Sequence, residues 1–279
     1  WIYNFRSSGK IMFLQLRDGS GFIQCVVEKE KINEEKWNNL QKINIEASIK
    51  LKGIVKEDKR SETGFEISVT DFDILNYSNE DYPISKKEHG VDFLMDNRHL
   101  WLRSRRQWAI QKIRNTVINA TYEYFQKEGF TKIDSPILTA NACEGTTELF
   151  EIDYFGRPAY LSQSGQLYLE AAIFSVGKCF DFGPVFRAEK SKTRRHLTEF
   201  WMMDAEMAFY DYIDNMRVQE ELITHIVEKV LENNRKELEL LERNIEPLEK
   251  IKPPFIVKTH AEVVNELRAM GSDIKEYDD

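Results

Sequence analysis

The chain has 279 residues, of which 42% are hydrophobic and 31% are charged, and its formal net charge at pH 7 is −8. This length can bury a sizeable core in one or two domains, and the composition excludes a disordered tail. No apolar run reaches the ~18–20 residues that cross a membrane, and the first residues lack the apolar core of a secretory signal. We therefore expect a cytoplasmic protein without a membrane partner.

The cysteines and histidines form no pattern that would hold a metal or a disulfide framework. The three cysteines are Cys25, Cys143 and Cys179, and no two of them make a CxxC pair. None of the five histidines stands in an HxxxH or HExxH spacing. We interpret the cysteines as reduced thiols and expect no metal ligands within the chain.

Residues 1–77 are predicted to form a small β-barrel. Short, apolar, β-prone segments recur along this region, at residues 11–16, 22–27, 45–55 and 65–75. The first two are joined by Asp18-Gly19-Ser20-Gly21, which is a strong turn signal, and a helix is predicted at 29–40. Short strands with one helix fit an oligonucleotide-binding OB-fold, and they also fit another small barrel of the SH3-like kind.

Residues 78–100 are polar and are interpreted as a hinge, and a second domain is expected over residues 101–279. It opens with an amphipathic helix at 105–128, which Gly129 ends. Further strands are predicted at 150–154, 159–161, 179–186 and 200–209, and further helices at 165–176, 214–243 and 259–271. Because these elements follow no regular βαβ rhythm, they favour an α+β fold with an antiparallel sheet.

A cationic loop follows the strand predicted at 179–186. That strand leads into Arg187 and a loop dense in lysine and arginine, and the chain returns through His196 to a strand that begins at Phe200. Guanidinium groups grip phosphate in a fork geometry, so this hairpin suits a polyphosphate. Since the chain has neither a P-loop nor a GxGxxG run, side chains would hold any nucleotide. The alternative is a solvated basic hairpin.

The hairpin run FRAEKSKTRRHLTEF (186–200) resembles motif 2 of the class II aminoacyl-tRNA synthetases, in the form of the aspartyl, asparaginyl and lysyl subgroup. Residues 130–136 resemble motif 1, and Pro136 is its hallmark proline. Motif 1 implies a homodimer interface at this segment. EGTTELF (144–150) resembles the loop that closes over the amino acid, and YLSQSGQLYLE (160–170) resembles the amino-acid pocket of the asparaginyl enzymes. These motifs occur in order at compatible spacing, so together they are highly specific.

The resemblance covers essentially the whole chain and implies its architecture. The expected fold is α+β: an N-terminal OB-fold β-barrel, followed by a class II synthetase catalytic domain whose antiparallel sheet is flanked by helices. The third class II motif, with an arginine beside the ATP tail, is expected beyond Asp279. We therefore expect a catalytic domain that is incomplete at its C-terminus. Most ligands of the Mg²⁺ that accompanies ATP are expected beyond it too.

The resemblance also implies an ATP site in the hairpin. Arg187 would be the catalytic residue, because it would contact the α-phosphate and the amino-acid carboxylate and neutralise the charge that builds up between them. Glu189 would bind the adenine amino group, and Phe200 would stack on the adenine ring. Arg195 and His196 would face the outer phosphates.

The pocket run implies the amino-acid site. Glu144 and Gln166 would hold the α-ammonium group of the substrate, and Gln163 would belong to the same pocket. Ser162 and Ser164 have no convincing base beside them, so a nucleophilic role is not expected for either. We interpret both serines as structural or hydrogen-bonding residues.

Amino-acid choice depends on two further positions. Leu169 stands where the aspartyl enzymes usually carry a lysine that neutralises the substrate carboxylate, so a neutral amide is favoured here. Asp204 stands where asparaginyl enzymes often have glutamate and aspartyl enzymes aspartate, and an acid there could accept a hydrogen bond from the amide nitrogen. The alternative for Leu169 is a core leucine that says nothing about the substrate.

In the barrel, FLQLRD (13–18) and FIQ (22–24) resemble the anticodon-binding OB-fold of the same subgroup. The resemblance implies that Phe13 stacks on the middle anticodon base while Arg6 and Gln24 read its edge. Single-stranded bases are the usual target of sequence-specific RNA recognition, and stacking contributes ~1–3 kcal/mol per base. The alternative for Phe13 is a plain core residue.

These expectations combine into one hypothesis, an asparagine–tRNA ligase. It would use ATP to activate L-asparagine as asparaginyl-adenylate and transfer the acyl group to tRNA(Asn), as a homodimer. Three alternatives stay open: an aspartate–tRNA ligase that charges both tRNAs, a synthetase-like asparagine synthetase, and a non-catalytic synthetase-like tRNA-binding protein. The barrel at 1–77 counts against the second of these, because such paralogues are expected to lack it.

Overall fold

The computed structural model describes residues 1–61, 63–79, 82–84, 87–143, 148–190, 193 and 196–274. The chain divides into two compact units, Trp1–Trp101 and Leu102–Asp279. Two of the expected substrate residues, Glu144 and Arg195, lie outside the described residues. None of the helices in the described ranges is both long enough and apolar enough to cross a membrane.

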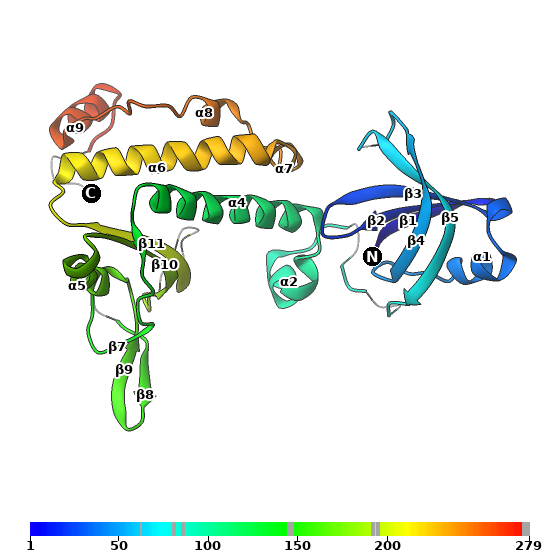
Figure 1. Ribbon diagram of the computed structural model, residues 1–279, viewed down its shortest axis with the longest axis horizontal. Coiled ribbons are helices and arrows are strands. Elements are labelled where there is room, and N and C mark those ends of the chain that lie inside the picture. Colours follow the sequence, from blue (N-terminus) through cyan, green and yellow to red (C-terminus); the bar gives the residue numbers. More distant parts are fainter. Residues whose placement is uncertain are drawn as a thin grey trace. The chain divides into compact units, whose positions relative to one another are not determined.

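The first unit is a five-stranded sheet in the order β1-β2-β3-β5-β4 (Figure 1). Its elements are β1 (Ile2–Ser8), β2 (Ile11–Arg17), β3 (Phe22–Glu28), a 3₁₀ turn η1 (Lys29–Lys31), α1 (Glu34–Leu40), β4 (Ser48–Glu57) and β5 (Phe65–Asn76). β3 and β5 pair in parallel and the other neighbours are antiparallel. Ile2 also exchanges main-chain hydrogen bonds with Glu46 and Ala47 just before β4, which brings the two ends of the sheet together.

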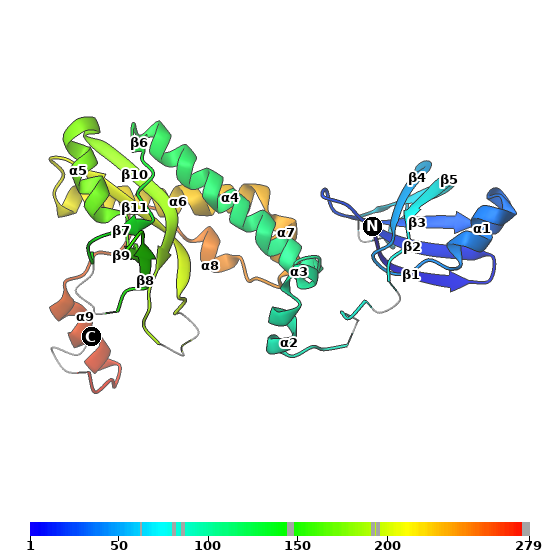
Figure 2. The ribbon, with the colours of Figure 1, turned by 90° about the horizontal axis from the view of Figure 1, so that it is seen from below.

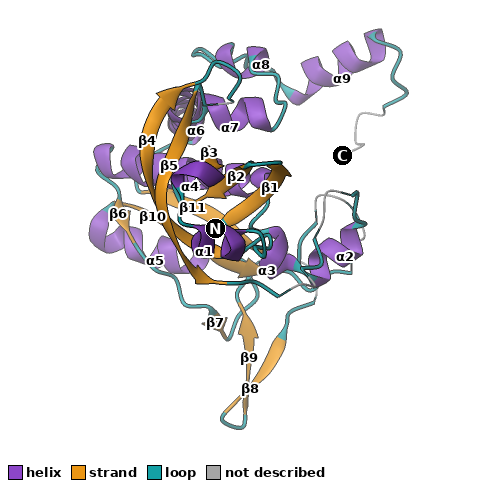
Figure 3. Cartoon of the chain, turned by 90° about the vertical axis from the view of Figure 1, so that its right-hand side faces the viewer, coloured by secondary structure: helices purple, strands orange, loops and turns teal. Residues whose placement is uncertain are grey.

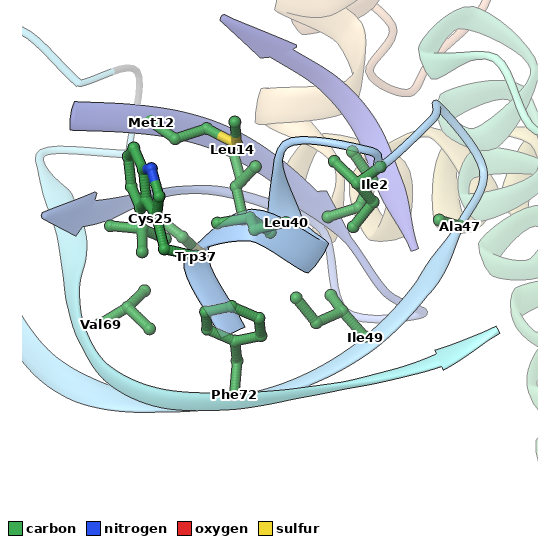
Figure 4. Packing of buried hydrophobic residues seen from close by; sticks show 12 residues of the cluster. Ile2, Met12, Leu14, Cys25, Trp37, Leu40, Ala47, Ile49, Val69 and Phe72 are labelled. Atoms are coloured by element: carbon green, nitrogen blue, oxygen red, sulfur yellow. The ribbon is translucent and has the colours of Figure 1, made fainter. Parts of the chain in front are cut away.

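Alternation along the strands places one set of side chains inside the barrel. Met12 and Leu14 of β2 point inward and are almost fully buried, whereas Phe13 between them is only half-buried. Trp37 and Leu40 of α1 complete the core (Figure 4). The helix begins at Asn33, whose side-chain oxygen accepts hydrogen bonds from two main-chain N–H groups of the first turn.

Two parts of the first unit differ from the sequence-based expectation. The first strand, β1, was not predicted, and the helix expected at 29–40 is divided into η1 and α1. The polar segment interpreted as a hinge contains the helices α2 (Val91–Asp96) and α3 (Arg98–Trp101). Both helices are short, with no fully buried residue, so they carry little of the apolar periodicity that a sequence can reveal.

The second unit contains two three-stranded sheets (Figures 2 and 3). One has the order β11-β10-β6, with β6 (Thr131–Lys132), β10 (Lys178–Phe186) and β11 (Glu199–Met207). The other has the order β7-β9-β8, with β7 (Leu138–Thr139), β8 (Glu151–Tyr154) and β9 (Arg157–Leu161). The helices are α4 (Arg105–Lys127), α5 (Gln166–Val176), α6 (Tyr212–Asn233), α7 (Arg235–Leu240), α8 (Glu246–Glu249) and α9 (His260–Ala269).

The β11-β10-β6 sheet is covered on both faces. Phe180 of β10 packs with Phe125 of α4 and Leu222 of α6 in one buried cluster, and the two long helices lie side by side (Figures 1 and 2). α5 packs against the opposite face, where its Leu169 is fully buried. The face that α5 covers is therefore the one on which α5 packs against β10 and β11.

The helix predicted at 214–243 is shorter than expected. α6 ends at Asn233, and Asn234 leaves the helical conformation with φ −127° before α7 begins. The predicted helices at 165–176 and 259–271 are confirmed, and Thr259 and Glu262 make the reciprocal capping box that their spacing indicated.

Candidate functional site

The β10–β11 hairpin brings two of the predicted ATP residues together. Val185 pairs with Phe200, and the N–H of Arg187 donates to the carbonyl of Thr198 at 3.0 Å, so the ladder continues beyond the strand ends. Arg187 and Phe200 leave the hairpin on the same face. The guanidinium carbon of Arg187 lies 5.6 Å from the centre of the Phe200 ring. The hairpin therefore places a guanidinium group over an aromatic ring.

The loop of this hairpin carries the remaining predicted ATP residues. Glu189 is half-buried two residues after Arg187, and His196 is exposed near the return strand. The Nδ1 atom of His196 shares a hydrogen bond with the hydroxyl of Thr193. Within the described residues, the structure thus joins Arg187 to Phe200 and joins His196 to Thr193.

The segment after β9 is tied to both neighbouring elements by main-chain hydrogen bonds. Ser162 donates its N–H to the carbonyl of Ile137 at 2.8 Å and accepts from the N–H of Phe186 at 2.9 Å. Gln163, the next residue, is 2% exposed. Gln166 lies at the first turn of α5, where its amide nitrogen donates to Glu170 at 2.9 Å. The two glutamines of the pocket run therefore differ: one is buried and the other is on the surface.

Asp204 lies opposite Asp181 in the β10–β11 pairing, so both carboxylates leave the sheet on the face that α5 covers. Its Oδ2 accepts two hydrogen bonds, from the hydroxyl of Ser164 at 3.1 Å and from the N–H of Gly165 at 2.9 Å. Sequence reasoning assigned Ser164 only a generic role and missed this contact. The available signal was the position of Ser164 just before the helix predicted at 165–176, because a serine there frequently caps a helix.

A cavity of about 310 Å³ lies beside β10, and Pro136 and Asp204 are among the described residues that line it. Leu169 is 0% exposed, and its carbonyl accepts a contact from the thiol of Cys179 at 3.6 Å. It is not among the residues that line this cavity. The side chain of Leu169 therefore belongs to the packing between α5 and the sheet.

Several charged groups surround this face. Burial raises the pKa of Glu206, and the nearby carboxylates of Glu170 and Asp204 raise it further. Asp181 forms an ion pair with Lys132 at 3.0 Å. Burial alone would lower the pKa of Lys132, but its hydrogen bonds to acidic partners outweigh this and raise it. The described part of the site is thus acidic on the sheet, with the half-buried Lys132 at its side.

The barrel carries a second pocket, of about 200 Å³, that contains Arg6, Phe13 and Gln24 together. Arg6 and Phe13 are cross-strand neighbours, and the guanidinium carbon lies 4.4 Å from the ring centre. The amide nitrogen of Gln24 donates to Glu66 at 3.1 Å. Phe13 is not part of the buried core cluster. Sequence reasoning missed Arg60 and its neighbours in the β4–β5 loop, which also line this pocket.

An apolar groove of about 440 Å³ runs along α4. Its lining residues are Ile110, Ile113, Arg114, Val117, Ile118, Phe182, Trp201 and Leu241. Trp201 is half exposed there. Pro136 is exposed as well, in the segment between β6 and β7. In the described part of the chain, no group of three or more His, Cys, Asp or Glu side chains is arranged to hold a metal ion.

Comparison with protein families identifies both units. Residues 90–278 match the family described as tRNA synthetases class II (D, K and N), and residues 1–75 match the family described as OB-fold nucleic acid binding domain. The expected fold, an OB-fold barrel followed by a class II synthetase domain, is confirmed.

Solved structures of whole synthetases resemble the chain over its full length. An asparaginyl-tRNA synthetase from Pyrococcus horikoshii complexed with asparaginyl-adenylate is 39% identical, with a TM-score of 0.93, and the match covers 100% of this chain and 64% of that one. An asparaginyl-tRNA synthetase from Entamoeba histolytica in complex with asparaginyl-adenylate is 29% identical, with a TM-score of 0.85, over 100% and 65%. An aspartyl-tRNA synthetase from Entamoeba histolytica is 28% identical, with a TM-score of 0.80, over 100% and 60%. The chain thus spans less than two thirds of these relatives.

Proposed function

Because the chain belongs to the class II tRNA synthetases (D, K and N), we propose that it provides the anticodon-binding and ATP-binding parts of an asparagine–tRNA ligase. The observation that carries the asparagine assignment is the chemistry beside Asp204. Its described partners are a hydroxyl and a main-chain N–H, and Leu169, a core leucine of α5, occupies the position where the aspartyl enzymes usually carry a lysine. An acidic side chain beside the substrate accepts a neutral amide and repels a carboxylate.

In the proposed first step, a carboxylate oxygen of asparagine attacks the α-phosphorus of ATP and pyrophosphate leaves. Arg187 neutralises the negative charge that develops between the carboxylate and the phosphate. Phe200 stacks on the adenine ring and Glu189 binds the adenine amino group. Arg195 and His196 face the outer phosphates. The contact between Arg187 and Phe200 supports this assignment, because it presents the stacking surface and the cation from one hairpin.

In the second step, the 3′-terminal hydroxyl of the tRNA attacks the acyl carbon, and AMP leaves. The described residues offer no cluster that would hold Mg²⁺, so no step is assigned to the metal. The amino acid itself would be held through its α-ammonium group by Glu144 and Gln166, in a pocket that Gln163 and Asp204 complete. Leu169 packs between α5 and the sheet, and it supports the assignment only as the position where the aspartyl enzymes usually carry a lysine.

We assign the pocket of the barrel to the anticodon of tRNA(Asn). Phe13 stacks on one base, and Arg6 and Gln24 bind its edge. The common pocket of these three residues, outside the barrel core, supports the assignment. The hinge at 78–100 joins this anticodon-binding domain to the catalytic domain at 101–279.

We also propose that the enzyme is a homodimer through α4 and the segment around Pro136. The apolar groove along α4 supports this, because contiguous exposed apolar surface usually marks an interaction site. A second copy of the chain that buries this groove would remove Trp201 and its isoleucine neighbours from water.

Pyrophosphate exchange tests the proposal directly. A natural protein that contains this chain in full is assayed with ATP and either asparagine or aspartate. Exchange with asparagine and not with aspartate is expected. The alternative function, an aspartate–tRNA ligase that charges both tRNAs, is favoured by one observation: the position of Asp204 holds aspartate, as is usual in aspartyl enzymes. Exchange with aspartate alone would refute the asparagine assignment.

A further inference from the structure

We propose that Ser164 is a positioning residue that sets amino-acid specificity. Its hydroxyl and the N–H of Gly165 hold one oxygen of the Asp204 carboxylate, so that the other oxygen accepts the side-chain amide of asparagine. The inference rests on the proposed function and deepens it. It gives Asp204 a defined orientation, with Ser164 and Gly165 as its two donors.

The hydrogen-bond directions at Ser164 follow from its neighbours. The N–H of Gln166 donates to the Ser164 hydroxyl oxygen at 3.1 Å. That oxygen is therefore an acceptor toward the helix, and its own hydrogen points to Asp204 Oδ2, 3.1 Å away. Gly165 donates to the same oxygen at 2.9 Å. Ser164 is 8% exposed, so water competes little for these bonds. Both donors converge on Oδ2, and Oδ1 is the oxygen that we assign to the substrate.

Gly165 also packs closely against Ser135 and Asp181. A Cβ atom on Gly165 would lie 2.7 Å from the Ser135 hydroxyl and 2.9 Å from Asp181 Oδ2. Asp181 has little freedom to move, because the Ser135 N–H donates to this oxygen at 3.1 Å and Lys132 holds its other oxygen at 3.0 Å. Only glycine therefore allows the main chain to approach this closely and still donate to Asp204.

The arrangement explains how an aspartate can select an amide when its described partners are a hydroxyl and a main-chain N–H. The free oxygen of the oriented carboxylate accepts a hydrogen bond from the amide nitrogen of asparagine and repels the carboxylate of aspartate. If Ser164 loses its hydroxyl, Asp204 keeps one donor and gains freedom to rotate, which weakens both effects.

The test compares Ser164→Ala with Thr121→Ala. The hydroxyl of Thr121, a buried residue of α4, donates to the carbonyl of Val117 at 2.8 Å, and Thr121 does not line the cavity beside β10. This control therefore removes a buried hydroxyl away from Ser164 and Asp204. The measured quantity is the ratio of kcat/KM for asparagine to kcat/KM for aspartate, in pyrophosphate exchange at saturating ATP. We expect Ser164→Ala to lower this ratio about tenfold, as for the loss of one hydrogen bond to a charged group. Thr121→Ala is expected to leave the ratio unchanged.

Two further variants keep the test decisive if Ser164→Ala folds poorly. Ser164→Thr retains the hydroxyl and is expected to retain the ratio, whereas Gly165→Ala displaces the second donor and is expected to lower it. Equal ratios for wild type, Ser164→Ala and Gly165→Ala would overturn the inference while leaving the proposed function intact. A wild-type protein that shows no exchange with asparagine would instead overturn the proposed function and the inference together.

Discussion

Replacement of Phe13 by alanine is the sharpest test of the barrel pocket. Phe13 is only half-buried and lies outside the barrel core, so the substitution should leave the fold intact. The guanidinium group of Arg6 also stacks on this ring, and its carbon lies 4.4 Å from the ring centre. Loss of one stacked base costs ~1–3 kcal/mol, and loss of the surface under Arg6 adds to it, so we expect tRNA affinity to fall roughly 10–100-fold.

The assay is fluorescence anisotropy with tRNA(Asn), at several salt concentrations. Because Phe13→Ala removes no charge, the slope of log Kd against log salt should stay unchanged while the whole line shifts. Phe65→Ala is the matched control: Phe65 lies in the same barrel, is 45% exposed, and does not line the pocket. Equal affinities for Phe13→Ala and Phe65→Ala, with both proteins folded, would refute the assignment of this pocket to the anticodon.

Three further outcomes are expected. Arg17→Met should lower the free energy of unfolding by about 3–5 kcal/mol in urea titrations, because it removes the bidentate partner of the buried Glu46 carboxylate. Lys10→Met breaks an exposed pair and should leave the free energy of unfolding nearly unchanged, so equal losses for the two variants would contradict this. Ile113→Glu should convert the proposed dimer to monomer in light scattering, since it places a charge in the apolar groove of α4, and an unchanged dimer mass would refute that interface. Burial raises the pKa of Cys25 to about 12, so this side chain stays a protonated thiol at pH 8. It should therefore react with a disulfide reagent only after unfolding. Rapid labelling of Cys25 in the native protein would contradict its burial.

Local pattern was sufficient for much of the fold. The apolar, β-prone run at residues 11–16 predicts a strand, and the structure confirms it as β2. The capping box of Thr259 and Glu262 marks where a helix begins, because its two hydrogen bonds lie within one turn of chain. The first strand, β1, escaped prediction because its pairing partners are β2 and the residues before β4, and its own residues lose apolar character toward Ser8.

The candidate site divides in the same way. Residue types indicated a cationic hairpin suited to a polyphosphate. The resemblance of the motifs to the class II synthetases implied the pocket run for an amino acid and the aromatic residue on a barrel strand for RNA. The contacts that give these residues their roles were decided only by the tertiary structure. Asp204 meets Ser164 across 40 residues of sequence, and Lys132 meets Asp181 across 49. Such pairs depend on how β10, β11 and α5 pack together, because hydrogen bonds between distant segments leave no periodic trace in the chain.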